Sequence, residues 1–528
     1  MEPLNAPQRN FARPTAAALA FAATLAISAF NEHAPLDVTA GVPARAIAAV
    51  VPPVAAIVAA LAVLRPWRGF VAVLVTTPVV NVGQVSMGVG TVQVILQSVF
   101  VVALSIGALF DLAASRRPIV PRDATGRRSL PDWVRTKAAI PAAATASFAI
   151  LAILSTLRSP DLWSSLDVLL HGILEPMAMA LLLLWFRPGR SRLVVVAAAL
   201  GIAVAMGGFL DMVQSLPGST LSHLQTDRLL FTRITYFNVG LFAEMVAMAG
   251  PLLAALLLAR RRLGFRRGAT IGVAVALGLS LVSLFFTFSK SGYLSAAAGL
   301  LVMVLLVAET WRRRAAILVA AALASSLFVP WPELALGAVP PLAQAYRAAV
   351  VGIVGQSRFD SWNPATRSGQ GSLVERFYAT RAAFEMALDN PGLGIGLDQF
   401  ETEYVEEYKP PQATLDLDSA HSMWAEVSAE LGFPALFLLL TVYVSATVAA
   451  WLAYRRAGPA VRILAAGWLG AIVAWLVVAT TFAGDMYRPW RNMAADFVMM
   501  AIVMAGAFAL YRTAAAGRRT PAARDQTG

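Results

Sequence analysis

Long apolar runs alternate with short polar segments along the whole chain. A helix crosses the roughly 30 Å hydrocarbon core of a membrane with about 20 mostly apolar residues. Fourteen runs approach that length, at 14–30, 43–64, 69–86, 90–112, 138–157, 163–186, 193–214, 236–259, 268–288, 291–310, 315–332, 433–454, 463–483 and 494–511. The pattern predicts an all-α polytopic membrane protein. Prolines inside the second and third runs keep the expected count at about 12–14 transmembrane helices.

One of these runs, 163–186, carries ionisable residues. Asp167, His171 and Glu175 are spaced four residues apart, so they share one face of a helix. Ionisable groups inside a membrane usually serve a function, and a proton path is one interpretation. The other is that this run is a surface-lying or broken helix.

Basic residues predict the orientation of the spans. With the N-terminus inside, every second loop is basic, and these loops hold 29 of the 42 lysines and arginines. The positive-inside rule then places both termini in the cytoplasm. The expected organisation is eleven transmembrane helices in 1–332, a large extracytoplasmic loop in 333–420, a periplasmic lead-in helix with the last three spans in 421–511, and a basic cytoplasmic tail in 512–528.

Composition supports the membrane assignment and excludes several chemistries. The chain is 58% hydrophobic and 14% charged, whereas soluble domains carry about 25% charged residues. With no cysteine, it has no disulfide, thiolate nucleophile or iron–sulfur cluster, and four histidines leave little room for a metal site. The net charge of +12 follows from the basic inner loops, so no nucleic-acid partner is expected.

Arginines on the outer side are contrary to the positive-inside rule, so topology does not explain their positions. Most lie in the loop 333–420, including Arg376 and Arg381, while Arg233 and Lys290 lie at helix ends. Guanidinium groups bind phosphate oxyanions through paired hydrogen bonds, which favours a diphosphate site. The alternative is a solvated loop whose arginines pair with its own acidic residues.

A candidate general base lies where the loop returns to the membrane. The segment DSAHSMWAEVSAELGFP (418–434) predicts a short helix capped by Asp418 or Ser419, with a break at Gly432. His421 would then lie in the first turn, where the helix dipole and cationic neighbours lower its pKa and keep it neutral. A neutral imidazole there can act as a base, although an isolated histidine is often structural.

Two other motifs in the loop have simpler interpretations. GLGIG (392–396) follows Asn390-Pro391 and lacks the strand–turn–helix context of a nucleotide fingerprint, so a tight turn is expected. The tripeptide DLD (416–418) is similar to a metal-binding pair of sugar-nucleotide transferases, but one such tripeptide arises easily by chance.

Four segments in order resemble the superfamily of O-antigen ligases and Wzy-type polysaccharide polymerases. They are RITYFN (233–238), FTFSKSGYLSAAAG (286–299), ERFYATRAAFEMALDNPGLGIGLDQF (375–400) and HSMWAEVSAELG (421–432). Lys290 stands where the family has the arginine of an Arg-x-x-x-Leu motif. It keeps the charge but loses the two-pronged hydrogen bonding of a guanidinium.

The resemblance implies a GT-C-like helical fold in the bacterial inner membrane, with one long periplasmic loop, and an inverting glycosyltransferase that needs no metal or other cofactor. It implies an undecaprenyl-diphosphate-linked glycan as donor, and a glycan or lipid A-core as acceptor. His421 would be the catalytic base, and Lys290, Arg376, Arg233 and Arg381 would bind the diphosphate. The sequence does not separate ligase from polymerase or from protein O-oligosaccharyltransferase. A transporter or flippase of lipid-linked sugars is the rival, but no paired inverted repeat supports it.

Overall fold

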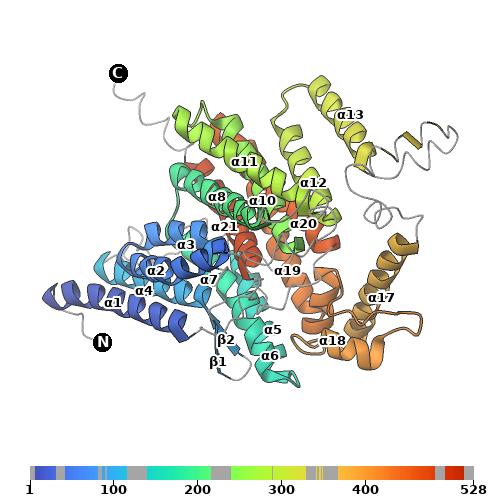
Figure 1. The fold of residues 1–528 in the computed structure, drawn as a ribbon, viewed down its shortest axis with the longest axis horizontal. Helices are drawn as coiled ribbons and strands as arrows, with labels where there is room; N and C mark the ends of the chain where they lie inside the picture. The colour runs from blue at the N-terminus through green and yellow to red at the C-terminus, as the bar shows by residue number, and fades with distance from the viewer. Residues whose placement is uncertain are drawn as a thin grey trace, which may run out of the picture.

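Each of the fourteen apolar runs overlaps a helix in the computed structural model (Figure 1). The structure describes residues 6–30, 42–80, 86–89, 92–115, 139–215, 239–287, 289–328, four positions between 341 and 348, 367–481 and 494–516. Within these ranges, eight helices are long and apolar enough to cross a membrane, and three shorter apolar helices accompany them. The predicted all-α, multi-pass membrane fold is confirmed, while the count of 12–14 spans stays a prediction.

The first four helices pack together at the left of Figure 1. They are α1 (Ala6–Phe30), α2 (Val42–Leu64), α3 (Pro66–Val80) and α4 (Leu96–Ser115). Gly69 of α3 and Gly107 of α4 both approach Ala62 of α2, where an added Cβ would lie 2.3 Å from the backbone of Ala62. Small residues at such crossings let helix backbones come close, which is how membrane helices gain packing contacts.

A short hairpin between α3 and α4 corrects two predicted boundaries. Strand β1 (Ser86–Val89) pairs with antiparallel β2 (Val92–Ile95), and Ser86 lies opposite Ile95. The runs 69–86 and 90–112 were expected to be helical up to this point. Glycines between β-branched residues in VSMGVGTVQVI favour a hairpin over a helix, because glycine weakens helices and valine suits strands.

The next helices include the run 163–186, which carries the three ionisable residues. They are α5 (Ala139–Arg158), α6 (Leu162–Val168), the π-helix η2 (Leu169–Leu174), α7 (Glu175–Trp185) and α8 (Arg190–Ser215). The stretch Leu162–Trp185 is helical throughout, with a π-helical turn at Leu169–Leu174, so the helix is not broken; whether it crosses the membrane or lies on its surface stays an open prediction. His171 is buried, and its Nε2 and Nδ1 lie 3.5 Å and 3.0 Å from the carboxylates of Asp167 and Glu175.

Three helices form the densest part of the bundle. They are α10 (Val239–Ala259), α12 (Lys290–Val307) and α20 (Pro459–Thr481). Helix α11 (Arg267–Thr287) packs on α10 and α21 (Ala494–Ala516) packs on α20, while α13 (Trp311–Phe328) follows α12 at the periphery (Figure 1). At the contact of α12 with α20, a Cβ on Gly299 would lie 2.6 Å from the carbonyl oxygen of Gly470. Pro251 of α10 lies against both glycines, so small residues again set the crossing.

The described part of the outer loop lies at the lower right of Figure 1. It comprises α17 (Arg367–Asp389), α18 (Phe400–Glu403) and the π-helix η3 (Tyr404–Tyr408), and it leads into α19 (Met423–Arg456). Gly432 interrupts α19 with φ 81° and ψ 170°, which confirms the predicted break before the apolar part of the helix.

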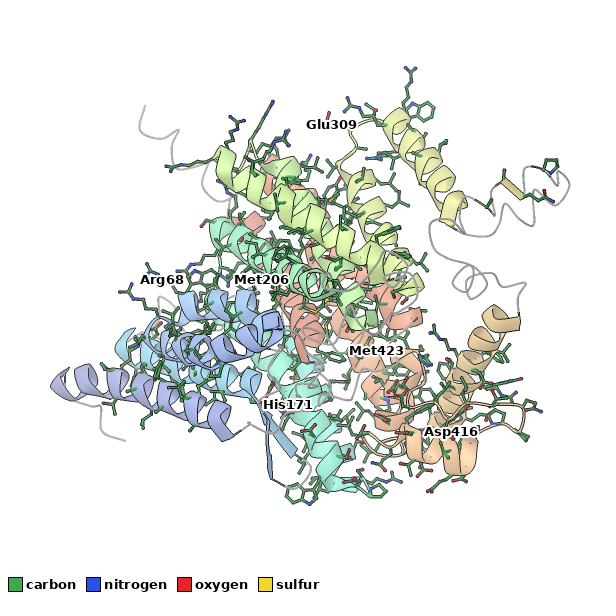
Figure 2. All side chains as sticks on the ribbon, viewed as in Figure 1. Arg68, His171, Met206, Glu309, Asp416 and Met423 are labelled. Carbon is green, nitrogen blue, oxygen red and sulfur yellow. The ribbon has the colours of Figure 1, made fainter. Side chains whose placement is uncertain are left out.

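Two side chains mark the opposite ends of the molecule. Figure 2 places Glu309, in the turn from α12 to α13, at one end, and Asp416, in the loop before α19, at the other. The turn at Glu309 precedes the basic run Arg312 to Arg314. This separation fits the predicted alternation of inner and outer segments, and the orientation of the termini stays a prediction.

Candidate active site at the outer loop

The loop around His421 has its own small apolar core. Buried side chains from α17, α18, η3 and the first turns of α19 meet there: Ala379, Ala382, Ala383, Met386, Phe400, Tyr404, Ala420, Ala425 and Ala429. The rings of Phe400 and Tyr404 stack with centroids 5.5 Å apart. Because alanines dominate this core, α17 and the start of α19 pack closely, and the loop between them is held on a rigid base.

The glycine-rich segment forms the predicted tight turn and docks on α19. The N–H groups of Ile395 and Gly396 donate to the carbonyl oxygens of Ala429 and Glu430, at 2.9 Å and 3.3 Å. Gly394 has φ +68°, and a Cβ there would lie 2.2 Å from the backbone carbon of Glu430. Only glycine fits such a left-handed position at this close approach.

Serines near the end of α5 and the start of α6 bind the docked turn and α19 from the other side. The hydroxyl of Ser155 donates to the carbonyl oxygen of Glu430 at 2.7 Å, and that of Ser165 donates to the carbonyl oxygen of Leu397 at 2.5 Å. Ser164 donates to the carboxylate of Asp398. Segments more than 230 residues apart in sequence therefore fix the loop to the membrane bundle.

A buried carboxylate completes this junction. Glu430 is 2% exposed, and its Oε1 accepts a hydrogen bond from the N–H of Phe400 at 3.1 Å. The backbone of Asp398 and Gln399 also bonds to this carboxylate. Glu430 thus binds the backbone at the start of α18, where N–H groups have no partner within the helix.

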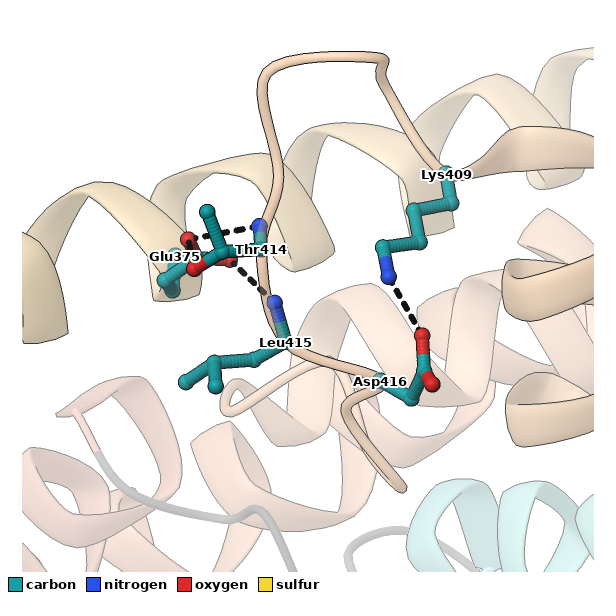
Figure 3. A network of polar contacts seen from close by, with 5 residues as sticks. All are labelled: Glu375, Lys409, Thr414, Leu415 and Asp416. Carbon is teal, nitrogen blue, oxygen red and sulfur yellow. Dashed lines mark hydrogen bonds and ion pairs between the residues drawn. The ribbon is translucent and has the colours of Figure 1, made fainter.

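A second carboxylate holds the strap 409–416 against α17 (Figure 3). The Oε1 atom of Glu375 accepts hydrogen bonds from the N–H and the hydroxyl of Thr414 at 2.9 Å and 2.7 Å, and Leu415 donates to Oε2. Burial acts to raise the pKa of Glu375, but these hydrogen bonds leave it below the ordinary value. Lys409 pairs with Asp416, the first aspartate of the DLD tripeptide.

His421 lies two residues before α19 and not in its first turn. The helix begins at Met423 with Ser422 as the N-cap, so the predicted capping by Asp418 or Ser419 is wrong. His421 has φ +52°, a left-handed backbone conformation, so the helix begins only after it. The hydroxyl of Thr380 in α17 donates to the carbonyl oxygen of Ala420 at 2.8 Å and fixes the adjacent backbone.

The surroundings of His421 keep its imidazole neutral. Burial lowers the pKa of His421 from 6.5 to about 4, and the positive charge of Arg376 contributes to the same shift. The predicted direction is confirmed, but the larger cause is burial and not the helix dipole. Arg376 follows Glu375 in α17, so the carboxylate that holds the strap also fixes the turn of α17 that carries this arginine.

Arg381, Lys290 and Arg233 are the remaining predicted site residues. Arg381 is exposed and pairs with Glu385 at 2.8 Å, as the solvated-loop interpretation expects. Lys290 begins α12 directly after its N-cap Ser289, whose hydroxyl accepts a hydrogen bond from Gly292. Arg233 lies outside the described residues. In the part of the chain that the structure describes, no group of three histidine, aspartate or glutamate side chains is placed to hold a metal ion.

Sequence reasoning missed the residues that build the scaffold of the site. Glu375 and Glu430 each bind backbone N–H groups of a distant segment. The sequence hardly indicates these roles, because both residues lie in helices, where a glutamate is ordinarily interpreted as solvent-exposed. The four serines of the α5–α6 region, at 155, 159, 164 and 165, form a recognisable polar cluster beside an apolar span.

Comparison with known families fits this geometry. Residues 275–440 match the sequence model of the O-antigen ligase family. The match supports the resemblance to the O-antigen ligase superfamily that the four motifs indicate. It contains three of the four predicted motifs and Lys290, Arg376 and His421, whereas RITYFN precedes it. A search among curated proteins gives no match. The family supports an enzymatic role as a membrane glycan ligase or polymerase that acts on lipid-linked glycan and an acceptor.

Proposed function

We propose that this protein is an inverting glycosyltransferase of the inner membrane that polymerises or ligates glycan from an undecaprenyl-diphosphate-linked donor. The site faces the periplasm. The observation that carries the proposal is the position of a half-buried, neutral His421 within the electrostatic reach of Arg376, in the segment that matches the O-antigen ligases. This pair supplies a base and a cation, which are the two groups that the reaction needs.

The reaction requires little further chemistry. The acceptor hydroxyl attacks the anomeric carbon of the donor sugar as its bond to the diphosphate oxygen breaks. The electron pair of that bond goes to the lipid diphosphate, whose charge Arg376, Lys290 and Arg233 stabilise. The hydroxyl proton goes to the imidazole of His421. The donor sugar ends with inverted configuration on the acceptor, and undecaprenyl diphosphate leaves.

The proposal is tested with purified protein in vesicles. We expect donor glycan and an acceptor, either lipid A-core or a second lipid-linked glycan, to give a larger glycan together with undecaprenyl diphosphate. Comparing the two acceptors separates a ligase from a polymerase. If the lipid-linked glycan crosses the bilayer and no glycosidic bond forms, the protein is a transporter and the proposal fails.

The pH dependence of the reaction follows from the pKa of His421. The profile of kcat/KM reports the free enzyme and should fall on its acidic side at about pH 4. The profile of kcat reports the enzyme–substrate complex and should fall at a higher pH, because bound diphosphate offsets the charge of Arg376. Initial rates measured between about pH 3.5 and about pH 8 cover both expected falls and check them. A fall of kcat/KM at or above the ordinary histidine pKa would contradict it.

The same pKa shift has a consequence for stability. Between its folded pKa of about 4 and the ordinary value of 6.5, His421 binds fewer protons in the folded protein than in the unfolded chain. Its contribution to stability is therefore complete above pH 6.5 and decreases as the pH falls toward 4.

Lys290 tests the diphosphate site in another part of the chain. Lys290→Ala should lose transfer activity, because the donor anion needs a cation at this turn, and Lys290→Arg should keep it. The loss of one charged hydrogen bond costs about 1.5–3 kcal/mol, or roughly 10- to 100-fold in rate. The measurement is transfer per molecule of protein at equal membrane levels. Normal transfer by Lys290→Ala would remove this turn from the diphosphate site.

A further inference from the structure

The helix that carries Arg376 is apolar on two opposite faces. One face of α17, with Ala379, Ala382, Ala383 and Met386, is buried in the small core of the loop. The other presents Val374, Phe377, Phe384 and Leu388, which are 44%, 64%, 41% and 68% exposed. Their spacing of three and four residues, with Arg381 between them, makes this second set a single stripe along the helix. We call it the α17 stripe.

Exposure of single apolar residues is ordinary, but four on one stripe of a helix indicate a partner. Helix α17 lies at the edge of the molecule in Figure 1, beside α19. Its flanks are polar: Arg376 and Thr380 follow one side, and Glu385 and Asp389 follow the other. A helix with an aromatic and aliphatic face and charged flanks is of the kind that lies in a membrane surface.

The end of the stripe meets the point where α19 enters the membrane. The carbonyl oxygen of Pro391, three residues after Leu388, accepts a hydrogen bond from the N–H of Phe433 at 3.1 Å. Phe433 follows the break at Gly432, and Phe437, one turn further along, is 65% exposed. Phe437 begins a row on the outside of a membrane span that continues with Val444, Val448 and Trp451. The C-terminal end of the α17 stripe therefore lies next to the start of a candidate membrane span that has an exposed apolar row of its own.

We infer that the α17 stripe rests in the bilayer surface beside α19 and contacts the acyl chains of the leaflet on that side. Partial burial of phenylalanine and leucine in this layer is favourable, and the helix then has a fixed depth. If the proposed function holds, this contact places Arg376, one residue before Phe377, at the level of lipid phosphates. The diphosphate of a lipid-linked donor lies in that same layer.

The chain suits a direct test because it contains no cysteine. Phe377→Cys, Phe384→Cys and Leu388→Cys, each carrying a nitroxide spin label, report collisions with oxygen, which concentrates in lipid, and with a nickel chelate, which stays in water. The labelled protein is measured in nanodiscs of phosphatidylethanolamine and phosphatidylglycerol. Phe437→Cys serves as the lipid-facing control, and Gln412→Cys, exposed in the polar strap, as the water-facing control.

We expect labels on the α17 stripe to collide more with oxygen than with nickel, as at position 437, and the label at 412 to show the reverse. Nickel collisions at 377 and 384 equal to those at 412 would overturn the inference. Shielding from both reagents would overturn it too, because a second copy or another segment of this chain would then cover the stripe. Neither result depends on transfer activity, so failure here is distinct from failure of the proposed enzyme function. Size-exclusion profiles confirm that each variant is folded.

Discussion

His421→Ala is expected to reduce glycan transfer by about 10²–10⁴-fold, the usual cost of removing a general base. The protein should still fold, because a residue with a Cβ already holds φ +52° at this position and the alanine adds no new side-chain atom, so the extra backbone cost is at most about 1–2 kcal/mol. Lipid-linked precursor should accumulate in cells that carry the variant. Initial rates with purified protein, together with the level of lipid-linked glycan in membranes, measure both effects.

Two further variants separate loss of the base from loss of structure. His421→Asn keeps a polar side chain that tolerates the left-handed backbone but has no basic nitrogen, so it should be as inactive as His421→Ala. His223→Ala, outside all four family motifs, should transfer glycan normally. Full activity of His421→Asn in the purified assay would contradict the base role and leave His421 as a residue that shapes the loop.

The membrane bundle was largely predictable because hydrophobic periodicity and span length are local properties. All fourteen runs overlap helices, and the break at Gly432 appears where Gly432 and Pro434 interrupt the pattern. The hairpin before α4 was missed because the apolar run 90–112 reads equally well as strand or helix at its start. Length alone assigned those residues to the helix.

The residues of the candidate site were predictable from the sequence, but the contacts that hold them in place were not. His421 and Arg376 were identified from their types and positions, and the direction of the pKa shift of His421 followed from its cationic neighbours. Burial, the larger cause, depends on how the loop packs on α17 and α19. Contacts such as Ser155 with Glu430, 275 residues apart, leave no periodic trace in the sequence.

The turn that docks the loop on α19 contains two glycines with different surroundings. Gly394 has φ +68°, and its position for a Cβ lies 2.2 Å from the backbone carbon and 2.3 Å from the carbonyl oxygen of Glu430. Gly392, two residues earlier, has no atom within 4 Å of that position. The turn therefore offers a matched pair in which one alanine clashes with α19 and the other points into open space.

Gly394→Ala is expected to destabilise the protein and to inactivate it. A left-handed backbone costs alanine about 1–2 kcal/mol, and a side chain forced into a packed contact costs about 1–3 kcal/mol more. The clash is with backbone, so the turn must move away from α19 and release the bonds of Ile395 and Gly396. Because the same helix begins two residues after His421, a shift of about 1 Å there lowers the rate by roughly 100-fold. Thermal unfolding in detergent and transfer rates measure the two effects. Gly392→Ala should match the parent in both, and a Gly394→Ala variant that also matches it would show that this turn does not position the site.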